Sequence, residues 1–129
     1  MLREGTTAYV IMNRYPYSCG HLLVIPCRHL GKIHELTPEE KVEIFDLIDL
    51  CVAVLAETIK PDGFNLGMNL GKVAGAGVDD HIHTHIVPRW SGDTNFMTVT
   101  GATRVVSEDL TQTRNNLFEC FERMSRQEV

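Results

Sequence analysis

The feature that most constrains this chain is the alternating run HIHTHI at positions 81–86. Side chains at alternate positions of a β-strand point to the same face, whereas an α-helix would spread them around its axis. A strand here would line up His81, His83 and His85 on one face and place Thr84 and the two isoleucines on the other. The run therefore predicts a half-buried strand with one polar face and one face against a core.

Four more extended segments are predicted from their β-branched and aromatic composition. They cover residues 6–13, 21–26, 64–70 and 97–106, the last as a strand or an irregular extended segment. The first two are joined by a short connection through Cys19 and Gly20, so we expect them to form a hairpin.

Two helices are predicted from start signals. The sequence TPEE at positions 37–40 is a capping box with Pro at the first helical position, and it predicts a helix to about Lys60. Ser107-Glu108-Asp109 predicts the start of a final helix that runs to about Met124. The apolar face of the first helix is formed by Ile44, Ile48, Cys51, Leu55 and Ile59, with Val52 beside them.

The order of these elements indicates an α+β fold. Strands that follow one another through short turns favour an antiparallel sheet, and the helices are expected to pack on one of its faces. We predict a single domain over residues 1–129, with about five antiparallel strands, one long helix and a C-terminal helix.

The charge pattern excludes some partners. Twelve Lys and Arg residues against seventeen Asp and Glu residues give a net charge of −5, and no basic run occurs. Binding to long nucleic acid depends on such basic surfaces, so we do not expect it. No apolar run is long enough to suggest a membrane span.

The start of the chain and its cysteines favour the cytoplasm. The residues after Met1 lack the charged, apolar and cleavage regions of a secretory signal. The four cysteines are Cys19, Cys27, Cys51 and Cys120, and no two form a C-x-x-C pair. We therefore interpret them as reduced structural thiols.

A glycine-rich loop at positions 71–78 precedes the histidines. Gly75 and Gly77, followed by Val78, are expected to expose backbone N–H groups rather than to continue a strand. Loops of this kind can surround an anion with N–H groups.

The three histidines allow three interpretations. They could form a solvated polar stripe, or ligate Zn²⁺ in a zinc-dependent hydrolase, since neutral imidazole is a favoured zinc ligand. They could also act on a phosphate group, because an imidazole nitrogen is a nucleophile near neutral pH and its neighbours can stabilise phosphoryl oxygens.

Several motifs of the chain resemble the histidine triad (HIT) family of nucleotide hydrolases and transferases. The run HIHTHIV at positions 81–87 resembles the family signature, and NRYP at 13–16, GHLLVIP at 20–26 and Pro88-Arg89 occur in the family's usual order. The stretch RWSGDTNFM at 89–97 most resembles the bacterial branch of fragile-histidine-triad and diadenosine tetraphosphate phosphorylase-like proteins.

The resemblance implies a role for each matched residue. His83 would be the nucleophile, His81 and His85 would orient it and contact the phosphate and leaving group, and His21 would support them from the hairpin. Asn13 would contact the ribose and Asn69 the phosphates. The backbone of the glycine-rich loop at Gly75, Gly77 and Val78 would line the phosphate path.

The implied activity is the cleavage of dinucleoside polyphosphates such as diadenosine tetraphosphate or triphosphate, or of related nucleoside phosphate esters, at the α-phosphate. Water would accept the nucleotide from the histidine; in the alternative, a phosphorylase, inorganic phosphate would. A zinc enzyme and a non-catalytic adenylate-binding sensor are further alternatives. The resemblance also implies a homodimer with no built-in cofactor, to which Mg²⁺ would come only with the substrate.

The sequence departs from the family pattern in three places. Thr84 replaces an apolar spacer, which is a mild change in a strand. The loop lacks the Gln-Ser or Gln-Thr pair of many members. The chain begins at the first long hairpin, so we expect either that Met1 is a short start or that base selection is loose.

Overall fold

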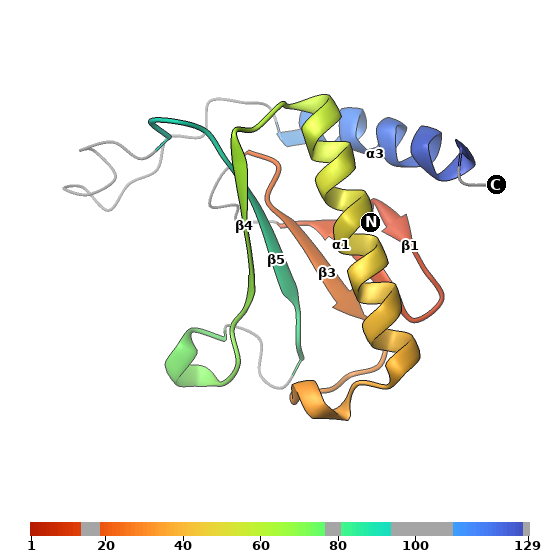
Figure 1. Ribbon diagram of the computed structural model, residues 1–129, viewed down its shortest axis with the longest axis vertical. Helices are drawn as coiled ribbons and strands as arrows, with labels where there is room; N and C mark the ends of the chain where they lie inside the picture. Colours follow the sequence, from red (N-terminus) through yellow and green to blue (C-terminus); the bar gives the residue numbers. More distant parts are fainter. Residues whose placement is uncertain (14–18, 77–80, 94–109, 128–129) are drawn as a thin grey trace.

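A computed structural model describes residues 1–13, 19–76, 81–93 and 110–127 (Figure 1). Five strands form one antiparallel sheet in the order β1-β2-β3-β5-β4. Their bounds are β1 Arg3–Glu4, β2 Ala8–Met12, β3 Leu22–Pro26, β4 Gly63–Met68 and β5 Thr84–Arg89. The helices are α1, Pro38–Thr58, and α3, Leu110–Gln127, with short 3-10 turns at η1, Ile33–Glu35, and η2, Lys72–Ala74. The predicted α+β class and antiparallel sheet are confirmed.

The predicted hairpin is formed by β2 and β3, which pair from Ala8↔Pro26 to Met12↔Leu22. Beyond the last pair, Asn13 N donates to His21 O at 2.9 Å. Gly20 enters β3 with φ +76°, and a Cβ at this position would lie 2.7 Å from Ile59 Cδ1. The turn therefore requires glycine, and it fixes the chain just before His21.

The strand predicted for the three histidines is shorter than expected. β5 begins at Thr84, which is the end of its pairing with both β3 and β4. His81 and His83 precede the strand because Ile82 N donates to Leu30 O at 2.8 Å, in the loop after β3, instead of continuing the sheet. The alternation itself is kept, since Ile82, Thr84 and Ile86 are buried and the histidines between them are not.

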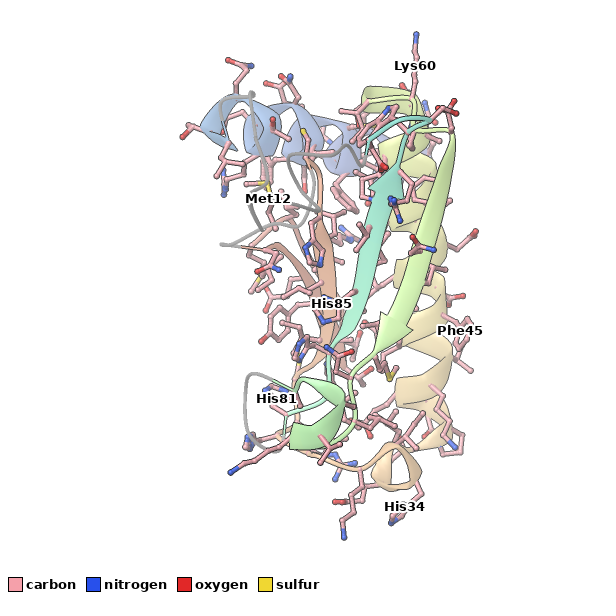
Figure 2. All side chains as sticks on the ribbon, turned by 90° about the vertical axis from the view of Figure 1, so that its left-hand side faces the viewer. Met12, His34, Phe45, Lys60, His81 and His85 are labelled. Carbon is pink, nitrogen blue, oxygen red and sulfur yellow. The ribbon has the colours of Figure 1, made fainter. Side chains whose placement is uncertain are left out.

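The capping box of the long helix is confirmed. Thr37 Oγ1 accepts from Glu40 N at 3.2 Å, and Glu40 Oε1 accepts from Thr37 N at 2.9 Å. Of the predicted apolar face, Ile44, Ile48, Cys51 and Leu55 are buried, and Ile59 and Val52 pack against the core as partly buried residues. The helix lies along one face of the sheet (Figures 1 and 2).

The C-terminal helix α3 crosses one end of α1 (Figure 1), and its Leu117, Cys120 and Phe121 are buried in the core. Its predicted start at Ser107-Glu108-Asp109 and the segment predicted over 97–106 lie outside the described residues. The strand β1 was not predicted, because two residues are too few to show a pattern. The first part of the predicted glycine-rich loop forms the 3-10 turn η2. None of the described helices combines the length and the apolar character needed to cross a membrane.

Candidate active site

The histidines lie on the face of the sheet opposite α1. In Figure 2, His81 and His85 lie on one side of β5 and Phe45 of α1 lies on the other. Because Ile82, Thr84 and Ile86 point into the core, the imidazoles between them are directed to the face that α1 does not cover. The candidate site therefore lies on the face of the sheet opposite the one that forms the core.

The hydrogen bond of His83 selects its tautomer. His83 Nδ1 lies 3.1 Å from the carbonyl oxygen of His81. A carbonyl can only accept, so Nδ1 carries the proton and the neutral ring keeps its lone pair on Nε2. This nitrogen is the candidate nucleophile.

A chain of side-chain hydrogen bonds runs from Asn13 through His21 to His85. Asn13 Nδ2 lies 3.1 Å from His21 Nδ1, and His21 Nε2 lies 2.9 Å from His85 Nδ1. The Asn13 amide nitrogen can only donate, so His21 donates from Nε2 and His85 accepts at Nδ1. His85 therefore carries its proton on Nε2. His21 is fully buried, which holds the chain in place.

The Nε2–H group of His85 is available to donate a hydrogen bond to a ligand. This atom is buried, and among the described residues it has no hydrogen-bond partner. A buried donor without a partner costs free energy, which a substrate oxygen would recover on binding. Burial, and after it the charge of nearby His83, lowers the pKa of His85 below its usual value, which favours the neutral ring. The rings of His83 and His85 lie 4.8 Å apart.

His81 is fixed by contacts outside the triad. Its Nε2 donates to the carbonyl oxygen of Pro26 at 2.9 Å. The His29 ring meets the His81 ring edge-on with centroids 4.9 Å apart. The sequence interpretation gave His29 no role, because only the folded loop after β3 brings it to the triad.

The phosphate-binding residues predicted from the resemblance are placed in part. Asn69 follows β4, and its Nδ2 donates to Gly75 O at 3.4 Å, so the amide and the glycine-rich loop lie together. Asn13 lies at the other end of the site, on His21. Gly77 and Val78 lie outside the described residues.

Arg89 lies at the far end of β5 and is held by other residues. Its guanidinium forms two hydrogen bonds with the Asp93 carboxylate, at 2.6 and 2.9 Å, and a third with Asn65 Oδ1 at 2.7 Å. The guanidinium therefore acts as a structural cation that closes the loop after β5.

The described residues show no preformed zinc site. Within residues 1–13, 19–76, 81–93 and 110–127, no group of three His, Cys, Asp or Glu side chains is arranged to hold a metal ion. The imidazoles instead use a ring nitrogen each for hydrogen bonds to backbone or to His21.

Comparisons with known proteins agree with this geometry. The model of the HIT domain family matches residues 2–92. An AP-4-A phosphorylase from Mycobacterium tuberculosis is 38% identical over 117 residues, which are 91% of this chain and 60% of the relative. The adenosine 5'-monophosphoramidase hnt1 of Schizosaccharomyces pombe is 36% identical over 88 residues, or 68% of this chain and 62% of that protein. This chain thus spans about 60% of the length of these relatives.

A solved structure shares the fold. The crystal structure of a Zn-bound histidine triad family protein from Mycobacterium smegmatis superposes with a TM-score of 0.78 at 25% identity. The match covers 98% of this chain and 86% of that one.

Proposed function

This chain belongs to the HIT family, and we propose that it cleaves dinucleoside polyphosphates or related nucleoside phosphate esters at the α-phosphate through a covalent nucleotidyl-His83 intermediate. The observation that carries the proposal is the pair of opposite tautomers in the site. His83 offers a lone pair at Nε2, and its neighbour His85 offers an N–H at the same ring position. One ring can attack phosphorus while the other binds an oxygen.

In the first step, His83 Nε2 attacks the α-phosphorus and forms a P–N bond as the P–O bond to the leaving group breaks. The proton stays on His83 Nδ1 and remains hydrogen-bonded to the carbonyl oxygen of His81, which stabilises the positive charge that develops on the ring. The Nε2–H of His85 donates a hydrogen bond to a phosphoryl oxygen or to the departing oxygen. Both groups are positioned before the substrate arrives, which reduces the reorganisation needed in the transition state.

In the second step, water attacks the same phosphorus and the P–N bond breaks. The electron pair of this bond returns to His83 Nε2, one water proton is released, and the nucleoside monophosphate leaves. On the substrate side, we propose that Asn13 faces the ribose and that Asn69 and the backbone at Gly75, Gly77 and Val78 face the phosphates. This placement of the ribose and the phosphates is supported by the contact of Asn13 with His21 at one end of the site and by the contact of Asn69 with Gly75 at the other.

A phosphorylase is the second candidate, because the relative from M. tuberculosis carries that name. Attack on diadenosine tetraphosphate would release ATP in either case. Water as acceptor then gives AMP, whereas inorganic phosphate gives ADP. Chromatography of the products with and without phosphate, in ¹⁸O-labelled water, separates the two reactions.

The experiment that tests the nucleophile is mass spectrometry of the intact protein after rapid mixing with diadenosine tetraphosphate and an acid-free quench. Wild type should gain the mass of one AMP group, and His83→Ala should gain none while keeping its unfolding midpoint. Turnover by His83→Ala at the wild-type rate would contradict the proposal and would favour direct attack by water.

The enzyme is further proposed to need no built-in metal, with Mg²⁺ entering only on the substrate. The tautomer pair supplies a nucleophile and a hydrogen-bond donor without a metal, which supports this. Activity should then survive dialysis against a chelator once Mg²⁺ is restored, and Zn²⁺ should not raise it.

A homodimer is also proposed. The α1 side of the sheet carries exposed apolar side chains: Val42 and Phe45 on α1, which are 62% and 72% exposed, and Leu66 on the edge strand β4, which is 52% exposed. Leu66 pairs with buried Ile86, which places it on the α1 face of the sheet. Apolar groups at an unpaired sheet edge favour association with a second copy.

The cytoplasm is proposed as the compartment. Cys51 and Cys120 are buried as thiols in the core, and burial raises the pKa of both. Thiols used for packing in this way suit a reducing environment.

A further inference from the structure

We propose that His29, in the loop after β3, is a positioning residue of this enzyme. Its ring supports the ring of His81, and through the His81 backbone it keeps His83 in the tautomer that can attack phosphorus. The inference rests on the function proposed above, and it adds a residue that lies outside both the triad and the β2–β3 hairpin.

The tautomer of His83 depends on the position of one backbone carbonyl. His83 Nδ1 donates to His81 O at 3.1 Å, near the long end of the range for an N–H···O hydrogen bond. A small displacement of the carbonyl would therefore weaken the bond that holds the proton on Nδ1. The pairing of β5 with β3 and β4 begins only at Thr84, so the sheet does not fix this carbonyl.

Three contacts from the loop after β3 hold the segment that carries this carbonyl. Pro26 O accepts a hydrogen bond from His81 Nε2 at 2.9 Å, and Leu30 O accepts one from Ile82 N at 2.8 Å. The third contact is the ring of His29, which meets the His81 ring edge-on, with centroids 4.9 Å apart and 77° between the planes. The first two contacts use backbone oxygens of the loop, which any residue would supply. Of the three, only the third depends on the identity of a loop side chain.

The ring contact restricts a motion that the hydrogen bond alone permits. A single hydrogen bond from Nε2 allows the His81 ring to turn about the line of that bond, and a turn of the ring is transmitted to the backbone of the same residue. An edge-on neighbour is a favoured arrangement of two rings, and it limits this rotation. We therefore expect the His29 ring to narrow the range of positions that the His81 carbonyl occupies.

The loop holds His29 in place without burying it. The side chain is exposed, so the removal of apolar surface from water contributes little to its position. The neighbouring residue Arg28 anchors the backbone, because its Nη2 donates to Glu35 O and to Glu40 Oε1, both at 2.8 Å. The His29 ring thus projects toward His81 from a backbone that is tied to the first turn of α1.

The test compares the turnover of diadenosine tetraphosphate by wild type, His29→Ala and His29→Phe. His29→Ala should lower kcat about threefold to tenfold, within the range of one aromatic pair, and should leave KM within about twofold, because the nucleophile is affected and not the binding of substrate. His29→Phe keeps a ring without an imidazole and should restore kcat close to the wild-type value. Neither variant should change the unfolding midpoint, because the side chain is exposed. His34→Ala removes another exposed imidazole, from η1, and serves as the matched control with unchanged kcat and KM.

A second readout needs no substrate. In ¹⁵N NMR spectra at alkaline pH, where imidazoles are neutral, wild type and His29→Phe should show His83 protonated at Nδ1, and His29→Ala should show a mixture of the two tautomers. An unchanged His83 spectrum in His29→Ala, or a loss of kcat that phenylalanine does not restore, would overturn the proposal. Absence of the His83 adduct in wild type, with a His83 tautomer that still responds to His29, would instead reject the proposed reaction and keep the support of His83 by His29.

Discussion

His21 contributes to the site without being exposed to solvent. It is fully buried and joins Asn13 to His85 through its two ring nitrogens. Since His21 donates from Nε2, it determines that His85 is protonated at Nε2, the atom directed to the substrate. We interpret it as a positioning residue whose effect is exerted through His85.

A His21→Ala variant should therefore lose activity through the tautomer of His85. We expect kcat to fall about tenfold to a hundredfold for phosphate leaving groups, the range seen when an orienting partner is removed. The loss of kcat should be smaller for nitrophenyl esters of the nucleotide, because nitrophenolate is a good leaving group that needs little stabilisation by a hydrogen-bond donor. In ¹⁵N NMR spectra, His85 should change from one tautomer to a mixture. An unchanged spectrum combined with a lower kcat would show that His21 acts in some other way.

At the level of residues, the sequence predicted which face the three imidazoles share but not the contacts they make. The alternation of HIHTHI predicted the shared face of the three rings, and this is confirmed by the burial of Ile82, Thr84 and Ile86. The hydrogen bonds of His81 to Pro26 and the ring contact with His29 depend on how the loop after β3 returns to β5. No local pattern records such a tertiary contact.

Among the elements, the first turn of α1 carries a charge pair that makes stability depend on pH. Glu40 is 4% exposed, and its pKa is lowered to about 2, first by the hydrogen bond from Arg28 and then by the backbone N–H of Thr37. Between the usual value of 4.5 and about 2, the unfolded carboxylate takes up a proton that the folded one does not. Stability from Glu40 is thus present above the usual pKa and is lost as the pH falls toward 2.

Glu40→Gln should lower the free energy of unfolding at pH 7 by about 1–3 kcal/mol, through loss of the charged hydrogen bonds and half of the capping box. Urea unfolding at several pH values should give curves for wild type and variant that converge as the pH falls from about 4.5 to about 2. Glu39→Gln, an exposed neighbour in the same turn, serves as the control and should run parallel to wild type. A constant difference between Glu40→Gln and wild type at all pH values would contradict the assignment.

The elements themselves were predictable where one signal dominated. The start of α1 followed from its capping box, and the hairpin from its short connection. The predicted start of β5 was wrong because its pairing with β3 and β4 begins only at Thr84, and the point where pairing begins is not visible in the chain itself. The 3-10 turn η2 is flanked by two glycines with positive φ, Gly71 and Gly75, and composition alone predicts only a loop there.

At the scale of the whole molecule, the proposed dimer gives a prediction for Phe45. Phe45→Glu should yield a monomer of 14.5 kDa in sedimentation experiments, where wild type gives twice that mass. The unfolding midpoint of the isolated monomer should hardly change, because the side chain is 72% exposed. Phe118→Glu makes the same change on α3 and should leave the dimer intact. A wild-type protein of 14.5 kDa at micromolar concentration would contradict the proposed association.

The segment from Ile82 to Ile86 forms the core with one set of side chains and the chemistry with the other. Its tolerance to substitution should therefore alternate along the chain. Substitutions at the even positions would lower the stability of the fold. Substitutions at the odd positions would lower the turnover rate of a protein that still folds. A lineage could thus exchange its reaction one odd position at a time without rebuilding its interior. A single inserted or deleted residue, by contrast, would turn every imidazole inward and lose both properties together.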